Sequence, residues 1–183
     1  MRSLEYIVVS VAAAALLGAC ATQMADTTPV PTKGPNLGRV ASADEIAARD
    51  ISIPPSGAGL PAGSGNARQG AAVYASKCQA CHGEKGMGKP ADMLVGGIGS
   101  LATDKPVRTV GSFWPYATTL FDYTRRAMPI TKTMSLTDDE TYAVTAYILS
   151  LNGIIADDAV MNAQTLPQVK MPNRDGFVDY SRK

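Results

Sequence analysis

Two cysteines and a histidine stand close together in mid-chain, at a spacing that can hold a cofactor covalently. They form the C-x-x-C-H motif Cys78-Gln79-Ala80-Cys81-His82. Each thiol can add across one vinyl group of a haem, and the histidine can then bind the iron. A redox dithiol shares the C-x-x-C spacing but does not explain the adjacent histidine, and a zinc site would need further ligands that the chain does not offer. The motif therefore predicts one covalent haem c on Cys78, Cys81 and His82.

The second axial ligand of such an iron has to come from elsewhere in the chain. His82 is the only histidine, so a second histidine ligand is excluded, which leaves methionine, a weaker group or an open position. Among the eight methionines, Met128 and Met134 lie between two expected helices, where a loop can cover the other face of a haem. We expect Met128, because Pro129 stiffens the backbone beside it. Met134, the earlier Met93 and a purely core-filling role for Met128 remain the alternatives.

The N-terminal residues have the pattern of an export signal. An apolar run from residue 7 to residue 17 is too short to span a bilayer but suits a secretory signal. The run ends in Leu-Gly-Ala before Cys20, which resembles the cleavage site of bacterial lipoproteins. We expect residues 1–19 to be a signal peptide and Cys20 to carry lipid, on the periplasmic side of a bacterial membrane. A signal peptide cleaved nearby without lipid attachment is the alternative.

The rest of the chain predicts one mainly helical domain with long loops, flanked by two extended arms. Residues 20–65 are rich in proline and glycine, as is typical of a linker or arm, with one short helix expected at 41–50. The domain spans residues 66–153, and residues 154–183 form a C-terminal extension of little periodicity. A net charge of +1 gives no indication of nucleic-acid binding.

The first helix of the domain is expected over residues 67–77. Asn66 and Gln69 have the spacing of a capping box, which would fix its start. Gly70 and Tyr74 share one face of this helix. A glycine there would let a second helix cross at close range, although a merely tolerated glycine is the alternative.

A glycine-rich loop and a second helix follow the motif. Residues 83–111 predict a loop, and the helix is expected to begin at Pro115, a favoured first position, and to end near residue 126. Its expected core-facing stripe is Tyr116, Leu120, Tyr123 and Ala127.

The last helix is expected over residues 138–151. Thr137 and Glu140 form a second capping box, and Asn152-Gly153 is a suitable end. The expected core-facing stripe of this helix is Val144, Tyr147, Ile148 and Leu151.

Together these features resemble the class I cytochromes c. More narrowly, the chain resembles the cytochrome subunits of the molybdenum sulfite and sulfane dehydrogenases of bacterial sulfur oxidation, the SoxD-like group. The stretches that carry this resemblance are 45–51, 59–65, 96–101, 109–129, 135–140 and 171–177, with 109–129 the most specific. The resemblance implies a molybdenum-containing partner that oxidises sulfite or a related sulfur compound, with electrons passing on to a downstream cytochrome or oxidase. Some members carry two haem domains, whereas this chain has one C-x-x-C-H motif.

Histidine–methionine ligation closes the coordination sphere, which suits electron transfer rather than catalysis. We therefore expect an electron-transfer protein and not an enzyme. A general membrane-tethered shuttle to a terminal oxidase, and a haem peroxidase in which Met128 dissociates, are the alternatives. If the resemblance holds, Trp114 could form a hydrogen bond with a haem propionate, or it could pack in the core. Arg108, Arg125 and Arg126 could pair with propionates or form a docking surface, and the last two could simply be a solvated helix end.

Overall fold

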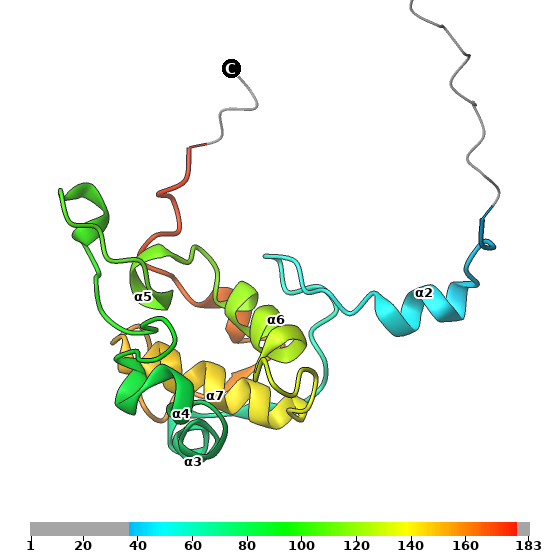
Figure 1. Cartoon of the computed structure of the whole chain (residues 1–183), viewed down its shortest axis with the longest axis horizontal. Helices are drawn as coiled ribbons and strands as arrows, with labels where there is room; N and C mark the ends of the chain where they lie inside the picture. The colour runs from blue at the N-terminus through cyan, green and yellow to red at the C-terminus, as the bar shows by residue number, and fades with distance from the viewer. Residues whose placement is uncertain (1–36, 179–183) are drawn as a thin grey trace, which may run out of the picture. The chain divides into compact units, whose positions relative to one another are not determined.

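A computed structural model describes residues 37–178 of the chain, which divides into two units, residues 1–43 and 44–183 (Figure 1). The predicted signal peptide 1–19 and Cys20 lie outside the described residues. No helix among residues 37–178 combines the length and apolar character that crossing a bilayer requires. The elements in chain order are α2 (Ala43–Arg49), β1 (Ser64–Gly65), α3 (Ala67–Lys77), α4 (Gln79–His82), η2 (Glu84–Gly86), η3 (Ser100–Ala102), α5 (Val110–Phe113), α6 (Ala117–Ala127), α7 (Asp138–Leu151), β2 (Met161–Asn162) and η4 (Leu166–Gln168). The mainly helical class is confirmed, and so is the short helix expected at 41–50, which is α2.

Helix α3 has the predicted bounds and the predicted cap. The Asn66 side chain accepts a hydrogen bond from the Gln69 N–H, and the Gln69 side chain accepts one from the Asn66 N–H, both at 3.0 Å. This reciprocal pair satisfies two N–H groups that helix geometry leaves unpaired. The helix ends at Cys78, whose φ of −125° departs from helical values.

Helix α3 crosses α7 (Figure 1). Gly70 lies at the crossing, as predicted from the glycine. A Cβ added at Gly70 would overlap the Ala143 carbonyl and lie 2.8 Å from the Cβ of Tyr147. Next to this contact Tyr74, which is 1% exposed, packs on the Tyr147 ring with 5.3 Å between centroids. Only a residue without a side chain allows the two backbones to approach this closely.

Helix α7 also has the predicted bounds. The Thr137 side chain accepts from the Glu140 N–H, and the Glu140 carboxylate accepts from the Thr137 N–H at 2.9 Å. Glu140 additionally pairs with Lys77 of α3 at 2.7 Å. The predicted stripe is too narrow, because α7 is packed by α3, α6 and β1 together and buries most of its circumference. The buried residues are Thr141, Tyr142, Ala143, Val144, Thr145, Ala146, Ile148 and Leu149.

Helix α6 begins later than predicted, at Ala117 with Tyr116 as its N-cap, so the expectation that Pro115 starts it is wrong. A separate short helix, α5, lies within and just after the stretch expected to be a loop, and it carries its own capping box between Thr109 and Ser112. The chain must leave α5 before it can begin α6. Trp114 is therefore extended (φ −74°, ψ 126°), the conformation that a following proline favours.

The buried face of α6 also differs from the predicted stripe. Leu120 is buried as predicted, but Phe121, which was not in the stripe, is fully buried and packs on Tyr142 with 4.4 Å between ring centroids. Tyr123 is 45% exposed and lines a cavity beside the C-x-x-C-H motif instead of the core. Apolar periodicity cannot separate these two faces, because a core and an apolar cavity select the same residue types.

The inner ends of both arms pack on the helical domain. Ser64–Gly65 (β1) pairs antiparallel with Met161–Asn162 (β2), so the segments before α3 and after α7 meet. Ile53 is 6% exposed and Leu166 is fully buried, and both belong to the same hydrophobic core as α6 and α7. Residues from 51–65 and from 154–171 therefore pack on the helical domain, which the low periodicity of the arms did not indicate. The limits of the domain at 66 and 153 remain predictions.

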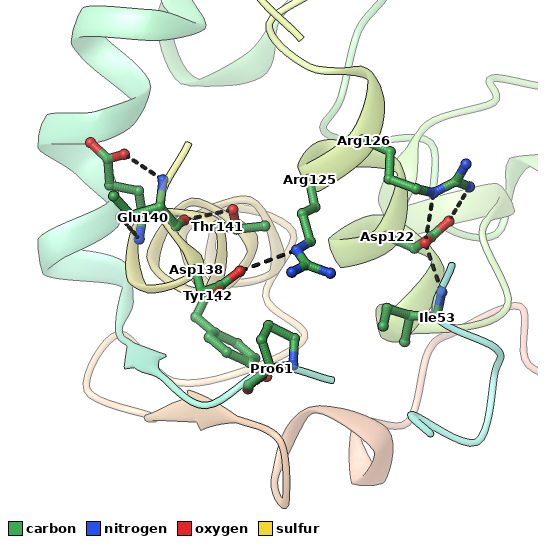
Figure 2. A network of polar contacts seen from close by, with 10 residues as sticks. Ile53, Pro61, Asp122, Arg125, Arg126, Asp138, Glu140, Thr141 and Tyr142 are labelled. Carbon is green, nitrogen blue, oxygen red and sulfur yellow. Dashed lines mark hydrogen bonds and ion pairs between the residues drawn. The ribbon is translucent and has the colours of Figure 1, made fainter. Parts of the chain in front are cut away.

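Buried polar contacts fix the N-terminal arm to the helices (Figure 2). Asp122 of α6 is 8% exposed, and its carboxylate accepts from the Ile53 N–H at 2.8 Å and from Arg126 Nε at 2.9 Å. Nearby, the Tyr142 hydroxyl donates to the Pro61 carbonyl at 2.9 Å. Burial opposes the charge on Asp122, but the bonds from Arg126 and Ile53 outweigh it and hold the pKa of this carboxyl below its usual value.

Replacing Asp122 with asparagine should therefore lower the free energy of unfolding at pH 7 by about 1.5–3 kcal/mol, the range for hydrogen bonds to a charged group. Because the folded-state pKa of Asp122 lies below its usual 3.8, this stabilisation is present above about pH 4 and is lost as the pH falls further. Urea unfolding of both proteins at pH 7 and pH 3 measures the gap. The exposed Asp104→Asn is the matched control, and a gap that stays constant between the two pH values contradicts the assignment.

Candidate functional site

The C-x-x-C-H motif lies where α3 turns into α4. Cys78 ends the first helix, and its carbonyl accepts from the N–H groups of Cys81 at 3.1 Å and His82 at 3.0 Å. This tight turn keeps the three side chains together, and all three line one cavity. The sequence alone places these residues correctly, because their spacing on one short helix determines where they lie.

The histidine is oriented by a backbone carbonyl. Nδ1 of His82 lies 2.9 Å from the carbonyl oxygen of Asp92, which can only accept, so Nδ1 carries the proton. The lone pair of Nε2 is then free to bind a metal. Two backbone hydrogen bonds hold the loop after α4 beside the histidine. The Gly88 N–H donates to the His82 carbonyl at 2.7 Å, and the Ala91 N–H donates to the Cys81 carbonyl at 2.8 Å.

The cavity beside the motif has a volume of about 510 Å³ and a mostly apolar wall. Val144 and Ile148 of α7 line it, and both are buried. Residues after α4 complete the wall together with residues in and around α5 and α6. The α5 and α6 region contributes Arg108, Thr109, Val110, Trp114, Tyr123, Thr124, Met128, Pro129, Ile130 and Thr131. A cavity of this size and character is typical of cofactor sites.

Two of the candidate methionines line this cavity. Met128 lies at the end of α6 and contributes to the wall, whereas Met134 is 63% exposed and does not. Met93 also lines the cavity, but it directly follows Asp92, whose carbonyl binds His82, so it belongs to the histidine side. The structure thus brings Met128 and His82 to one cavity from different elements, and it leaves Met134 outside.

Asn152 supports this cavity, although the sequence indicated only a helix end. Its side-chain oxygen accepts from the Gly96 N–H at 3.1 Å, and its amide donates to the carbonyls of Leu94 at 3.1 Å and Ile148 at 2.9 Å. Leu94 and Ile148 both line the cavity. A Cβ added at Gly111 would collide with the Asn152 side chain, so α5 is held against the same support.

The Cys78 thiol does not have the lowered pKa of a redox-active cysteine. Both cysteines are free. Burial raises the pKa of Cys78 to about 11; Lys77 opposes this shift and Cys81 adds to it. A catalytic thiol of a C-x-x-C motif needs a lowered pKa, because the thiolate is the nucleophile. No three His, Cys, Asp or Glu side chains within residues 37–178 gather as metal ligands.

The donor set and the cavity fit a haem. Two thiols, an imidazole with a free Nε2 and a thioether surround one apolar space, and these are the attachment groups and axial ligands of a c-type haem. The helical domain with its C-x-x-C-H turn is that of a class I cytochrome c.

Comparison with known proteins also relates this chain to cytochromes. Residues 65–148 match the family model for the cbb3-type cytochrome c oxidase subunit III. One solved structure, the sulfane dehydrogenase SoxCD from Paracoccus pantotrophus, has a chain 42% identical to this one with a TM-score of 0.74, and the match covers 81% of this chain and 74% of that one. No curated protein sequence gives a significant match. The chain therefore belongs to the cytochrome c family, as a SoxD-like cytochrome that transfers electrons and is not itself catalytic.

Proposed function

We propose that the chain carries one covalent haem c and passes single electrons from a molybdenum-containing sulfane or sulfite dehydrogenase to a downstream cytochrome or oxidase. In this proposal Cys78 and Cys81 attach the haem, and His82 and Met128 are its axial ligands. The observation that carries the proposal is the convergence of these four side chains on one apolar cavity.

The chain's own residues account for a relay function. When bound, haem supplies a one-electron iron couple, and methionine ligation favours its reduced form. The Asp92 carbonyl holds His82 in one tautomer, so the ligand does not need to reorganise. Val144 and Ile148 of α7, both buried, give the cavity part of its apolar wall. This arrangement favours electron transfer over peroxide chemistry, which needs an open coordination position.

The similarity to a chain of the sulfane dehydrogenase SoxCD supports the proposed partner. A sulfur-compound dehydrogenase releases electrons that a one-electron carrier has to accept. The identity of 42% extends over 81% of this chain, well beyond the haem motif, so it includes regions that contact neither thiols nor histidine.

Copurification tests this proposal. We expect the tagged full chain, isolated from the organism that encodes it, to retain a molybdenum protein, and its haem to be reduced by sulfite or a sulfane substrate only when that protein is present. A Cys78→Ser/Cys81→Ser double variant is the control without covalent haem. Haem reduction by an unrelated quinol–cytochrome system alone would favour a general shuttle, and peroxide turnover with a high-spin fraction would favour a peroxidase.

We also propose that the protein is exported to the periplasmic side of a bacterial membrane and is held there by lipid on Cys20. The supporting features are the apolar run 7–17 and the Leu-Gly-Ala-Cys20 sequence. Mass spectrometry of the mature N-terminus should find a diacylglyceryl group on Cys20. A mature chain that starts at another residue without lipid contradicts the anchor.

A further inference from the structure

Helix α2 (Ala43–Arg49) is exposed over its whole length. None of its seven residues is buried, and Ile46 is 54% exposed. An isolated helix shorter than about 12–15 residues is only marginally stable in water, so a short helix needs an apolar face packed against another surface. Residues 37–178 do not bury any side chain of α2, and this packing is therefore left for a surface that the helix meets on binding.

The residues of α2 divide into an apolar face and a charged remainder. Ala43, Ile46 and Ala47 are three and four residues apart, which places them on one face of the helix. The charged residues, which occupy the rest of the circumference, are Asp44, Glu45 and Arg49. An amphipathic helix of this kind can bind with its apolar face in an apolar groove of another protein.

The charge of α2 indicates the chemistry of the groove. Asp44, Glu45 and the following Asp50 carry three negative charges against the one positive charge of Arg49. A groove rimmed by lysine or arginine would complement this charge. A membrane surface with anionic lipids would not, because the helices that bind such surfaces carry lysine and arginine on their polar face. The charge therefore favours a protein groove over a lipid surface.

The chain that follows α2 is fixed to the helical domain. The Ile53 N–H donates to the Asp122 carboxylate of α6 at 2.8 Å, and Ile53 is 6% exposed (Figure 2). The link from Arg49 to Ile53 can span at most about 14 Å. A protein that binds α2 is therefore held beside the helical domain.

The similarity to a solved structure indicates which protein supplies the groove. The cytochrome family model begins at residue 65, after α2. The match to the chain of the sulfane dehydrogenase SoxCD covers 81% of this chain, a stretch too long to leave α2 outside it. The helix thus lies in the part that this chain shares with a dehydrogenase chain and outside the general cytochrome model.

We propose that α2 docks, through Ala43, Ile46 and Ala47, in an apolar groove with a basic rim on the molybdenum-containing dehydrogenase. This inference rests on the proposed function, which supplies that partner. No residue of α2 lines the cavity beside the C-x-x-C-H motif. The helix therefore contributes to the affinity between the two proteins and not to the electron-transfer step itself.

The first test is the affinity of the haem-loaded full chain for the molybdenum protein that copurifies with it. Ile46→Ala should raise the Kd about tenfold, because it removes most of an apolar side chain from the interface. Ala47→Glu should raise the Kd at least as much, because it places a charge on the apolar face. The matched control is Ala48→Glu, which adds the same charge one residue further along, outside the apolar face, and should change the Kd by less than about twofold.

The kinetics of haem reduction separate docking from a general defect. With sulfite or a sulfane substrate in excess, Ile46→Ala should need about tenfold more molybdenum protein for half-maximal reduction rate, and it should reach the wild-type rate at saturation. Because α2 has no buried residue, the variant should keep its covalent haem and its midpoint of denaturant unfolding. A lower rate at saturation with unchanged half-saturation contradicts a docking role.

Hydrogen exchange of the full chain identifies the occupant directly. The amides of α2 should exchange rapidly in the free chain, since so short a helix opens easily, and slowly after the molybdenum protein is added. Vesicles of phosphatidylethanolamine and phosphatidylglycerol should leave the exchange of these amides unchanged. Protection by the vesicles and not by the molybdenum protein would make α2 a membrane contact and overturn the inference.

The outcomes distinguish this inference from the proposed function. If the wild-type chain binds the molybdenum protein, and Ala47→Glu and Ala48→Glu bind it equally well, docking by α2 is overturned while the proposed partner stands. If no molybdenum protein copurifies with the wild-type chain, the proposed partner is overturned, and docking by α2 with it.

Discussion

Replacing Met128 with alanine should convert most of the ferric haem from low spin to high spin. Met128 is the methionine that the end of α6 brings to the cavity that His82 also lines, so its loss would leave the bound iron without the proposed second ligand. The reduction potential should also fall, because methionine ligation favours reduced iron. Visible absorption of the purified haem protein measures both, through loss of the charge-transfer band of methionine-ligated ferric haem and through redox titration.

Two matched methionine variants make this experiment specific. Met134→Ala removes a side chain that is 63% exposed and outside the cavity, and Met93→Ala removes one that lines the cavity next to Asp92. Both should keep the low-spin spectrum. An unchanged spectrum in Met128→Ala, or a high-spin spectrum in either control, would show that the ligand is assigned to the wrong methionine.

Replacing Gly70 with valine should cause a large loss of stability, because it forces α3 and α7 apart where their backbones touch. An alanine alone would gain about 1 kcal/mol of helix preference over glycine. However, a Cβ at this position overlaps the Ala143 carbonyl, which is backbone of α7 and cannot rotate away. Overpacking costs about 1–3 kcal/mol and occasionally more. We therefore expect a net loss for alanine and at least about 3 kcal/mol for valine, measured by denaturant unfolding of the haem-loaded protein.

The same helix offers a control. Ala72 lies on the exposed face of α3, and Ala72→Val should cost less than about 1 kcal/mol, the difference in helix preference. Because the crossing also positions the residues before Cys78, Gly70→Val should reduce the yield of covalent haem in maturation. Equal stability of the two valine variants would show that α3 and α7 can separate without loss.

Local sequence patterns predicted the two crossing helices well. The capping boxes at Asn66 and Thr137 depend only on residues three apart, so their geometry follows from the chain itself. Where the chain turns between elements, prediction was weaker. Pro115 suits the first position of a helix, but α5 ends just before it, and the extended residues between them move the start of α6 to Ala117.

The two arms show more clearly that local sequence patterns do not predict contacts between distant segments. Proline and glycine in residues 51–65 indicate a lack of helix, which is correct, but they do not indicate that Ile53 reaches the core and bonds to Asp122. Contacts between residues so far apart in sequence leave no periodic signal. The partners of the arginines are equally hard to predict from the sequence. The fold places Asp138 beside Arg125 and Asp122 beside Arg126, but the sequence does not distinguish these two arginines from Arg108.

By itself, the sequence determined the chemistry of this protein. Cys78, Cys81 and His82 lie within five consecutive residues, so their spacing alone predicts a site for covalent haem, and the single histidine excludes a second histidine as the other ligand. The tertiary structure alone decided which methionine shares a cavity with His82, which arginine of the cavity wall lies over the Phe113 ring, and how the C-terminal arm packs on that ring. These depend on the packing of segments far apart in the chain, which local spacing does not encode.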